Sequence, residues 1–189
     1  MIMCTYKQIC ISNRSLVQGD FLQQIKKVTQ SGIDFLILRE KDLPECEYQL
    51  LAKQVIEICE QNQVTCILHS FDRAADALSY PRLHVTMDKL RYMSEMQRQK
   101  YTILGVSTHS VEEAIEAQRL GATYITASHI FPTDCKKGLA PRGLSYLQEV
   151  KNAVSIPVYA LGGITPENTV LCREAGADGA CMMSYYMKM

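Results

Sequence analysis

Short apolar runs alternate with longer segments of helical period along the whole chain. Each apolar run is short enough to form a single buried strand. The runs predict strands at 5–12, 34–39, 64–69, 82–86, 101–106, 122–128, 155–161 and 178–182. Strands that alternate with helical segments indicate βα units and a parallel sheet.

The segments between the apolar runs carry the signals of amphipathic, capped helices. Leu51, Val55 and Ile58 recur at the spacing of one helical face. Ser110 followed by Glu113 matches a capping box. Thr165-Pro166-Glu167 predicts a helix with Thr165 as its N-cap and Pro166 at the first helical position.

Eight strands with intervening helices fit an α/β fold, namely a single-domain (β/α)₈ TIM barrel that spans residues 1–189. The chain has 189 residues, fewer than the roughly 200–250 usual for this fold. Because the chain ends soon after Ser184, we expect the last helix to be short or missing. A doubly wound open sheet is the alternative. No Pro/Ser-rich linker indicates a second domain.

Composition restricts the classes of partner. The 20 basic and 20 acidic side chains balance, so no overall field would attract nucleic acid or a membrane surface. No apolar run approaches the roughly 20 residues of a membrane span, and the N-terminus lacks the layout of a secretory signal. We therefore expect a cytoplasmic protein. The eight cysteines form no CxxC pair, which favours reduced core thiols.

Candidate chemical groups cluster after the predicted strands, whose carboxyl ends share one face of a parallel barrel. They are cations, histidines, hydroxyl-bearing residues, glycines and the residues of a polar loop: Arg39, Lys41, His69, Ser70, Ser107, His129, Thr133, Asp134, Cys135, Lys136, Gly162, Gly163, Met183 and Ser184.

Gly162 and Gly163 predict a phosphate site together with the amides of Met183 and Ser184. Glycines let backbone N–H groups approach an anion, and barrels often bind phosphate after strands seven and eight. The alternative is a glycine pair that serves only a tight turn.

His129 is the candidate proton carrier of the loop after the sixth predicted strand. Its apolar neighbours Ile130 and Phe131 would disfavour imidazolium and leave a neutral base. A buried histidine without a catalytic role is the alternative. Cys135 lies beside two lysines, but no base pairs with it, so a thiol at the rim explains it equally well. No cluster has the spacing of metal ligands, and no phosphate-loop or dinucleotide motif occurs.

Five segments in order resemble the thiamine phosphate synthase/TenI family: ILREKDL (37–43), GVSTHSVEEA (105–114), HIFPTDCKKGL (129–139), IPVYALGGITPEN (156–168) and AGADGACMMS (175–184). The resemblance covers nearly the whole chain and implies the same barrel. In this family the synthases join a hydroxymethylpyrimidine diphosphate to a thiazole phosphate with Mg²⁺, whereas the TenI branch aromatises a carboxythiazole phosphate.

Departures from the synthase pattern favour the tautomerase branch. The resemblance implies Asn-Asp, with a metal-binding Asp, where this chain has His69-Ser70, and Asp88 is displaced from the second expected acid. It also implies a small residue at His129 and Thr at Cys135. We therefore predict an isomerase, a thiazole tautomerase of thiamine biosynthesis, with His129 as acid and base.

The resemblance also implies the ligands. Gly162, Gly163, Met183 and Ser184 would hold the phosphate of a small thiazole phosphate, and residues 133–136 would position its ring. Arg39, Lys41 and Ser107 match the family's pyrimidine-diphosphate side. We expect no cofactor unless the chain is a synthase, which would need Mg²⁺. The alternatives are that synthase and a non-catalytic regulator that binds a thiazole or thiamine phosphate. A homodimer is compatible with the short C-terminal end.

Overall fold

Eight parallel strands close into a barrel in the order in which they occur along the chain. The structure is a computed structural model, and it describes residues 6–133 and 138–189. The strands are β1 (Lys7–Ile11), β2 (Phe35–Leu38), β3 (Thr65–His69), β4 (Arg82–Thr86), β5 (Ile103–Thr108), β6 (Tyr124–Ser128), β7 (Val158–Leu161) and β8 (Gly179–Met182). The (β/α)₈ barrel predicted from the sequence is confirmed, and the open-sheet alternative is excluded because β1 pairs with β8.

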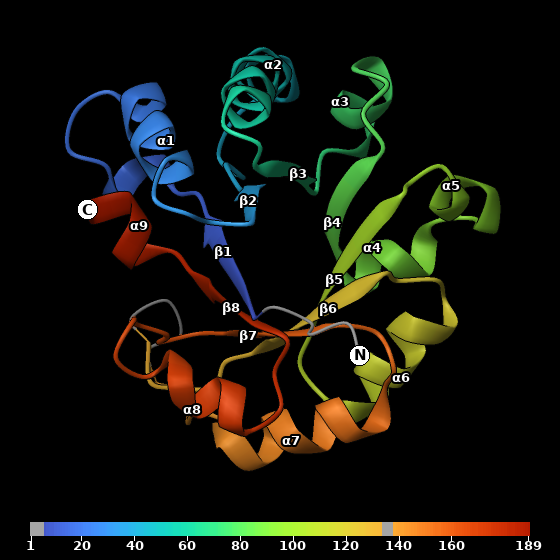
Figure 1. The fold of residues 1–189 in the computed structure, drawn as a ribbon. Helices are drawn as coiled ribbons and strands as arrows, with labels where there is room; N and C mark the ends of the chain where they lie inside the picture. Colours follow the sequence, from blue (N-terminus) through green and yellow to red (C-terminus); the bar gives the residue numbers. More distant parts are fainter. Residues whose placement is uncertain (1–5, 134–137) are drawn as a thin grey trace.

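Helices surround the strands as an outer ring (Figure 1). They are the 3₁₀ helix η1 (Arg14–Leu16) and the α-helices α1 (Phe21–Thr29), α2 (Glu45–Gln61), α3 (Asp72–Ala77), α4 (Met87–Tyr92), α5 (Glu95–Gln99), α6 (Val111–Arg119), α7 (Gly143–Ala153), α8 (Thr169–Glu174) and α9 (Ser184–Lys188). Across the described ranges, none of these helices is long and apolar enough to cross a membrane.

The start of α6 lies where the sequence predicts it, whereas the start of α8 does not. Ser110 caps α6 by accepting a hydrogen bond from the Glu113 amide at 3.1 Å. The helix predicted to begin after Thr165 instead begins at Thr169, with Asn168 as its N-cap. The Asn168 side chain accepts from the Thr165 amide and donates to the Gly163 carbonyl, so it stabilises a turn where the sequence indicated a helix.

The last helix is short, as expected from the length of the chain. α9 has five residues and lies beside α1 (Figure 1). The Gln24 side chain donates to the carbonyls of Tyr186 and Met189 at 2.6 and 3.3 Å. These bonds give two backbone carbonyls of the α9 segment a hydrogen-bond partner outside the helix.

Successive side chains of each strand point to opposite faces of the barrel wall, so the strands have one apolar region outside them and another inside. Outward-facing residues join the helices in the main core. Inward-facing residues fill the barrel, among them Ile9, Ile37, Ile67, Tyr124 and Tyr159. Polar side chains occupy the same inner face closer to the carboxyl ends of the strands, where the candidate site lies.

Gly105 makes room for two large side chains inside the barrel. It lies between His84 and Tyr124 in the strand register. A Cβ at Gly105 would lie 2.1 Å from Cζ of Tyr124 and 2.5 Å from Nδ1 of His84. The missing side chain therefore allows an imidazole and a phenol ring to meet across β5.

Replacing Gly105 with alanine is expected to destabilise the barrel by about 1–3 kcal/mol, because the added methyl group overpacks the interior. Urea unfolding would measure this loss. In a Tyr124→Leu background the same substitution should cost less, because the shorter side chain removes the closest contact. Additive effects of the two substitutions would show that Tyr124 does not impose the glycine.

Candidate active site

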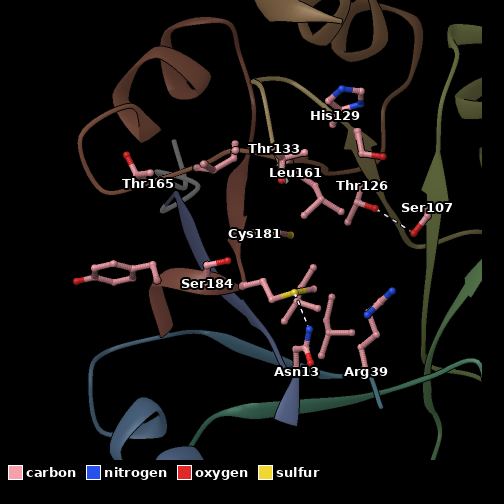
Figure 2. Close-up of a pocket in the computed structure, with 18 of the residues that line it drawn as sticks. Asn13, Arg39, Ser107, Thr126, His129, Thr133, Leu161, Thr165, Cys181 and Ser184 are labelled. Atoms are coloured by element: carbon pink, nitrogen blue, oxygen red, sulfur yellow. Dashed lines mark hydrogen bonds between the residues drawn. The ribbon is translucent and has the colours of Figure 1, made fainter. Parts of the chain in front are cut away.

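A cavity of about 890 Å³ opens at the carboxyl ends of the strands. This volume lies within the range of small-molecule sites. Residues at the ends of the strands and in the loops that follow them line it, and many of these appear in Figure 2. They include Asn13, Arg39, His69, His84, Ser107, Thr126, His129, Thr133, Gly162, Gly163, Met183 and Ser184.

One side of the cavity carries Arg39, which follows β2. Its amide donates to Ser12 Oγ at 2.9 Å, and Ser12 Oγ in turn donates to Glu40 at 2.6 Å. Glu40 is 2% exposed and also accepts from the amide and guanidinium of Arg14. Because these bonds satisfy the buried carboxylate within the loop, Glu40 fixes the backbone that presents Arg39 to the cavity.

Lys41 lies on the same rim, although it is not one of the residues that line the cavity. Partial desolvation and then the charge of Arg39 lower the pKa of Lys41. The charges of Arg39 and Lys41 therefore influence each other.

His69 and His84 form a stacked pair on the floor of the cavity. Their ring centroids are 5.2 Å apart, and the side chains are 5% and 2% exposed. Burial lowers the pKa of His69, and the neighbouring His84 and the charges of Lys41 and Arg39 lower it further. Burial and, to a smaller extent, the charge of Lys41 lower the pKa of His84 to about 3. Both imidazoles are thus neutral near pH 7, so this part of the cavity is polar without adding charge.

The opposite side of the cavity is formed by the loops after β7 and β8. Gly162 and Gly163 have φ values of +102° and +65°. A Cβ at Gly162 would lie 2.3 Å from Cβ of His129, and one at Gly163 would lie 2.4 Å from the carbonyl oxygen of Pro132. The glycines are therefore required by a positive φ and by the close packing of the loop after β6. Ser184 and Thr165 lie across the cavity from Ser107 and Arg39 (Figure 2).

His129 lies at the edge of the cavity and is 4% exposed. Its Nε2 lies 3.4 Å from the carbonyl oxygen of Leu139, and its Cβ packs where a side chain at Gly162 would be. These contacts give His129 a structural role. Its predicted catalytic role stays a prediction.

The fold brings together most of the residues that the sequence singled out. Arg39, Ser107, His129, Thr133, Gly162, Gly163, Met183 and Ser184 all line the cavity. Lys41 lies outside its lining, and Asp134, Cys135 and Lys136 lie outside the described residues.

Three residues that line the cavity are not among the candidates from the sequence: His84, Thr126 and Asn13. The alternation of β4 could have identified His84, because Arg82, His84 and Thr86 share one face while Leu83 and Val85 share the other. That inner face continues through Ser107 and Thr126 in the strand register.

The described residues do not fit a Mg²⁺ site of the kind that the family resemblance implies. Within residues 6–133 and 138–189, no group of three His, Cys, Asp or Glu residues could hold a metal ion. Asp88 is 85% exposed and pairs with Arg91, while Asp72 pairs with Lys89 at 2.8 Å. Among the described lining residues the only carboxylate is Glu167, which belongs to the β7 loop across from Arg39. Mg²⁺ prefers carboxylate oxygens, and the Arg39 side of the cavity presents cations and neutral imidazoles.

A parallel eight-stranded barrel with a polar cavity at the carboxyl ends of its strands is the architecture of a barrel enzyme that acts on a small molecule. The family model described as "Thiamine monophosphate synthase" matches residues 8–185. The chain belongs to this family.

Individual relatives agree with this assignment. The chain is 35% identical to a thiamine-phosphate synthase of Desulfitobacterium hafniense (strain DSM 10664 / DCB-2), with 95% of this chain and 88% of the relative covered. It is 31% identical to a thiamine-phosphate synthase of Syntrophomonas wolfei, with 99% and 91% covered. Among solved structures it resembles thiamine phosphate pyrophosphorylase from Pyrococcus furiosus with a TM-score of 0.84, 26% identity and coverage of 97% and 88%.

The prediction of an isomerase, a thiazole tautomerase, is wrong. The two curated relatives above, which match over nearly the whole chain, are named as thiamine-phosphate synthases, which are transferases. The prediction gave too much weight to a few positions, chiefly His129 and His69-Ser70. His129 packs against Gly162. This contact explains why a buried side chain stands at position 129 without any role in tautomerisation.

Replacing His84 with glutamine is expected to weaken the dependence of stability on pH. The folded pKa of about 3 lies below the ordinary value of 6.5, so below pH 6.5 the unfolded chain binds a proton that the folded chain does not. The free energy of unfolding therefore falls as the pH drops from 6.5 toward 3. Between pH 6.5 and 5, the wild-type protein should lose about 1–2 kcal/mol more than His84→Gln in urea unfolding. Equal losses would mean that the fold does not hold His84 neutral.

Proposed function

We propose that this chain is a thiamine-phosphate synthase that joins hydroxymethylpyrimidine diphosphate to thiazole phosphate. In this reaction a carbon–nitrogen bond forms between the two substrates and the bond from the methylene carbon to the diphosphate oxygen breaks. Pyrophosphate leaves with the electron pair. The relatives named as synthases support this proposal over nearly the full length of the chain.

The observation that carries the proposal is a single cavity with two separate polar sides. Arg39 and Ser107 lie on one side, and Gly163 and Ser184 lie on the other. A volume of about 890 Å³ suits two small substrates that meet between these sides. Holding both in one cavity replaces a bimolecular encounter by a positioned reaction.

The side formed by Gly162, Gly163 and Ser184 suits the phosphate of the thiazole substrate. The two glycines expose backbone at the cavity wall, and Ser184 adds a hydroxyl group and the first amide of α9. Amides at a helix start have no intrahelical acceptor and can donate to an anion. This side therefore binds one substrate by its phosphate and directs its ring toward the centre of the cavity.

The side formed by Arg39 and Ser107, with Lys41 two residues beyond Arg39 and outside the lining, suits the diphosphate. Arg39 can donate two parallel hydrogen bonds to phosphate oxygens, and Lys41 adds a second positive charge. Cations placed where the leaving group gains negative charge stabilise the transition state more than the bound substrate. The described residues on this side do not fit a Mg²⁺ site, so the positive charge here comes from side chains.

Incubating the protein with both substrates is expected to yield thiamine phosphate and pyrophosphate, measured by mass spectrometry and a pyrophosphate-release assay. Arg39→Gln should lower kcat/KM by about a hundredfold, since a bidentate charged contact to the leaving group is lost. Arg119→Gln, at an exposed position near the end of α6, is the matched control and should behave as wild type. Absence of thiamine phosphate at high protein concentration, with and without Mg²⁺, would contradict the proposed function.

Calorimetry with inorganic pyrophosphate would test whether protein cations or a bound metal ion neutralise the diphosphate in the cavity. We expect binding in EDTA to be within about tenfold of binding in Mg²⁺, because Arg39 and Lys41 supply the compensating charge. Arg39→Gln should weaken binding in EDTA by about tenfold or more. Binding that requires Mg²⁺ in the wild-type protein would show that a metal is held by residues other than those described.

A further inference from the structure

Three polar side chains from neighbouring strands form a continuous hydrogen-bonded series inside the barrel. The Tyr124 hydroxyl group on β6 lies 2.8 Å from Nδ1 of His84 on β4. Nε2 of His84 lies 2.8 Å from Oγ of Ser107 on β5. Tyr124 is buried at 3% exposure and His84 at 2%, whereas Ser107 and His84 both line the cavity.

The positions of hydrogen in this series follow from counting donors and acceptors. Within the described part of the chain, the hydrogen bond of the Tyr124 hydroxyl group is to His84. Burial raises the pKa of Tyr124 well above its ordinary value, so the phenol keeps its hydrogen. If Nδ1 of His84 carried a hydrogen, the phenol hydrogen would be buried without an acceptor, which is costly.

Tyr124 therefore donates to Nδ1, and His84 carries its hydrogen on Nε2. Nε2–H then donates to Ser107 Oγ. The Thr126 hydroxyl group lies 3.4 Å from Ser107 Oγ (Figure 2). Because the Ser107 oxygen accepts from the imidazole, its own hydrogen does not go to His84 and is available to an acceptor in the cavity.

We propose that Tyr124 and His84 are positioning residues that keep the hydrogen of the Ser107 hydroxyl group available for donation into the cavity. The ligand atom that this arrangement selects is one that only accepts, and Arg39 on the same side makes a phosphoryl oxygen the fitting choice. Identifying that oxygen with the diphosphate of the substrate rests on the proposed function. The orientation of Ser107 does not.

This arrangement is the reverse of a nucleophilic serine. In a Ser–His pair that activates the hydroxyl group, the imidazole accepts the serine hydrogen. Here the imidazole donates to serine, and its other nitrogen is already occupied by the phenol hydrogen. Ser107 consequently binds substrate and does not attack it.

The first test is the tautomer of His84 in the full-length protein, measured by long-range ¹H–¹⁵N correlation spectra of the imidazole nitrogens. The chain has 4 histidines, so a spectrum of His84→Gln assigns the signal. We expect the Nε2–H form at pH 7. In Tyr124→Phe, which lacks the phenol hydrogen, the Nδ1–H form should become detectable. An Nδ1–H tautomer in the wild-type protein would overturn the proposal.

The second test is calorimetric binding of inorganic pyrophosphate in EDTA and in Mg²⁺. Ser107→Ala should weaken binding by about tenfold or more, and Tyr124→Phe by about three- to tenfold, since a hydrogen bond to a charged group is lost or misdirected. The matched control is Tyr159→Phe. Its ring packs against Tyr124 at 5.1 Å, so this variant tests loss of a neighbouring hydroxyl group. Tyr124→Phe and Tyr159→Phe with equal affinities would overturn the positioning role.

The two proposals fail in different ways. If the His84 tautomer and the effects on pyrophosphate binding are as stated but no thiamine phosphate forms, the proposed function fails and the orientation of Ser107 stands. If thiamine phosphate forms while wild-type His84 carries its hydrogen on Nδ1, the positioning role fails and the function stands.

Discussion

Closure of the parallel sheet decides which side chains share the interior of this protein. In a closed barrel every second residue of each strand points inward, into a space that must be filled without clashes. Isoleucines and two tyrosines fill it at depth, and polar residues follow on the same face toward the cavity. Gly105 is required by this constraint, because His84 and Tyr124 converge on it from either side. The polar floor of the cavity is thus an extension of barrel packing.

The two sides of the cavity differ in how they can hold an anion. Around Arg39 the charge comes from side chains, and a buried carboxylate, Glu40, is turned away from the cavity by its bonds to Ser12 and Arg14. Around Gly163 the exposed groups are backbone. The neutral histidines lie on the same side as Arg39 and Ser107, so an anionic ligand there meets no competing carboxylate from the described lining residues nearby. This distribution suits two phosphorylated substrates better than one small ring.

The wrong prediction of a tautomerase shows what a local motif cannot decide. His129 stands beside apolar residues in a loop, and that pattern is typical both of a proton carrier and of a residue that packs on a glycine. The structure shows the packing contact with Gly162, while the similarity of the whole chain indicates synthases. At His69-Ser70 this chain still differs from the Asn-Asp pair that the resemblance implied for synthases. The neutral His69 side chain leaves the cavity floor without the negative charge that an aspartate would add.

The sequence by itself determined the eight strands, the barrel, the short last helix and most of the residues that line the cavity. Apolar periodicity reports burial along one element, and the ends of parallel strands must meet at one face, so these features need only local pattern and topology. Tertiary structure alone decided the turn at Thr165, where Asn168 supplies the hydrogen bonds that a helix would have made. It also decided the partners of His84, because Tyr124 lies 40 residues away and Ser107 lies 23 residues away. The direction of the hydrogen bonds from Tyr124 to His84 and from His84 to Ser107 depends on contacts among three strands. The sequence of a single strand does not contain these contacts.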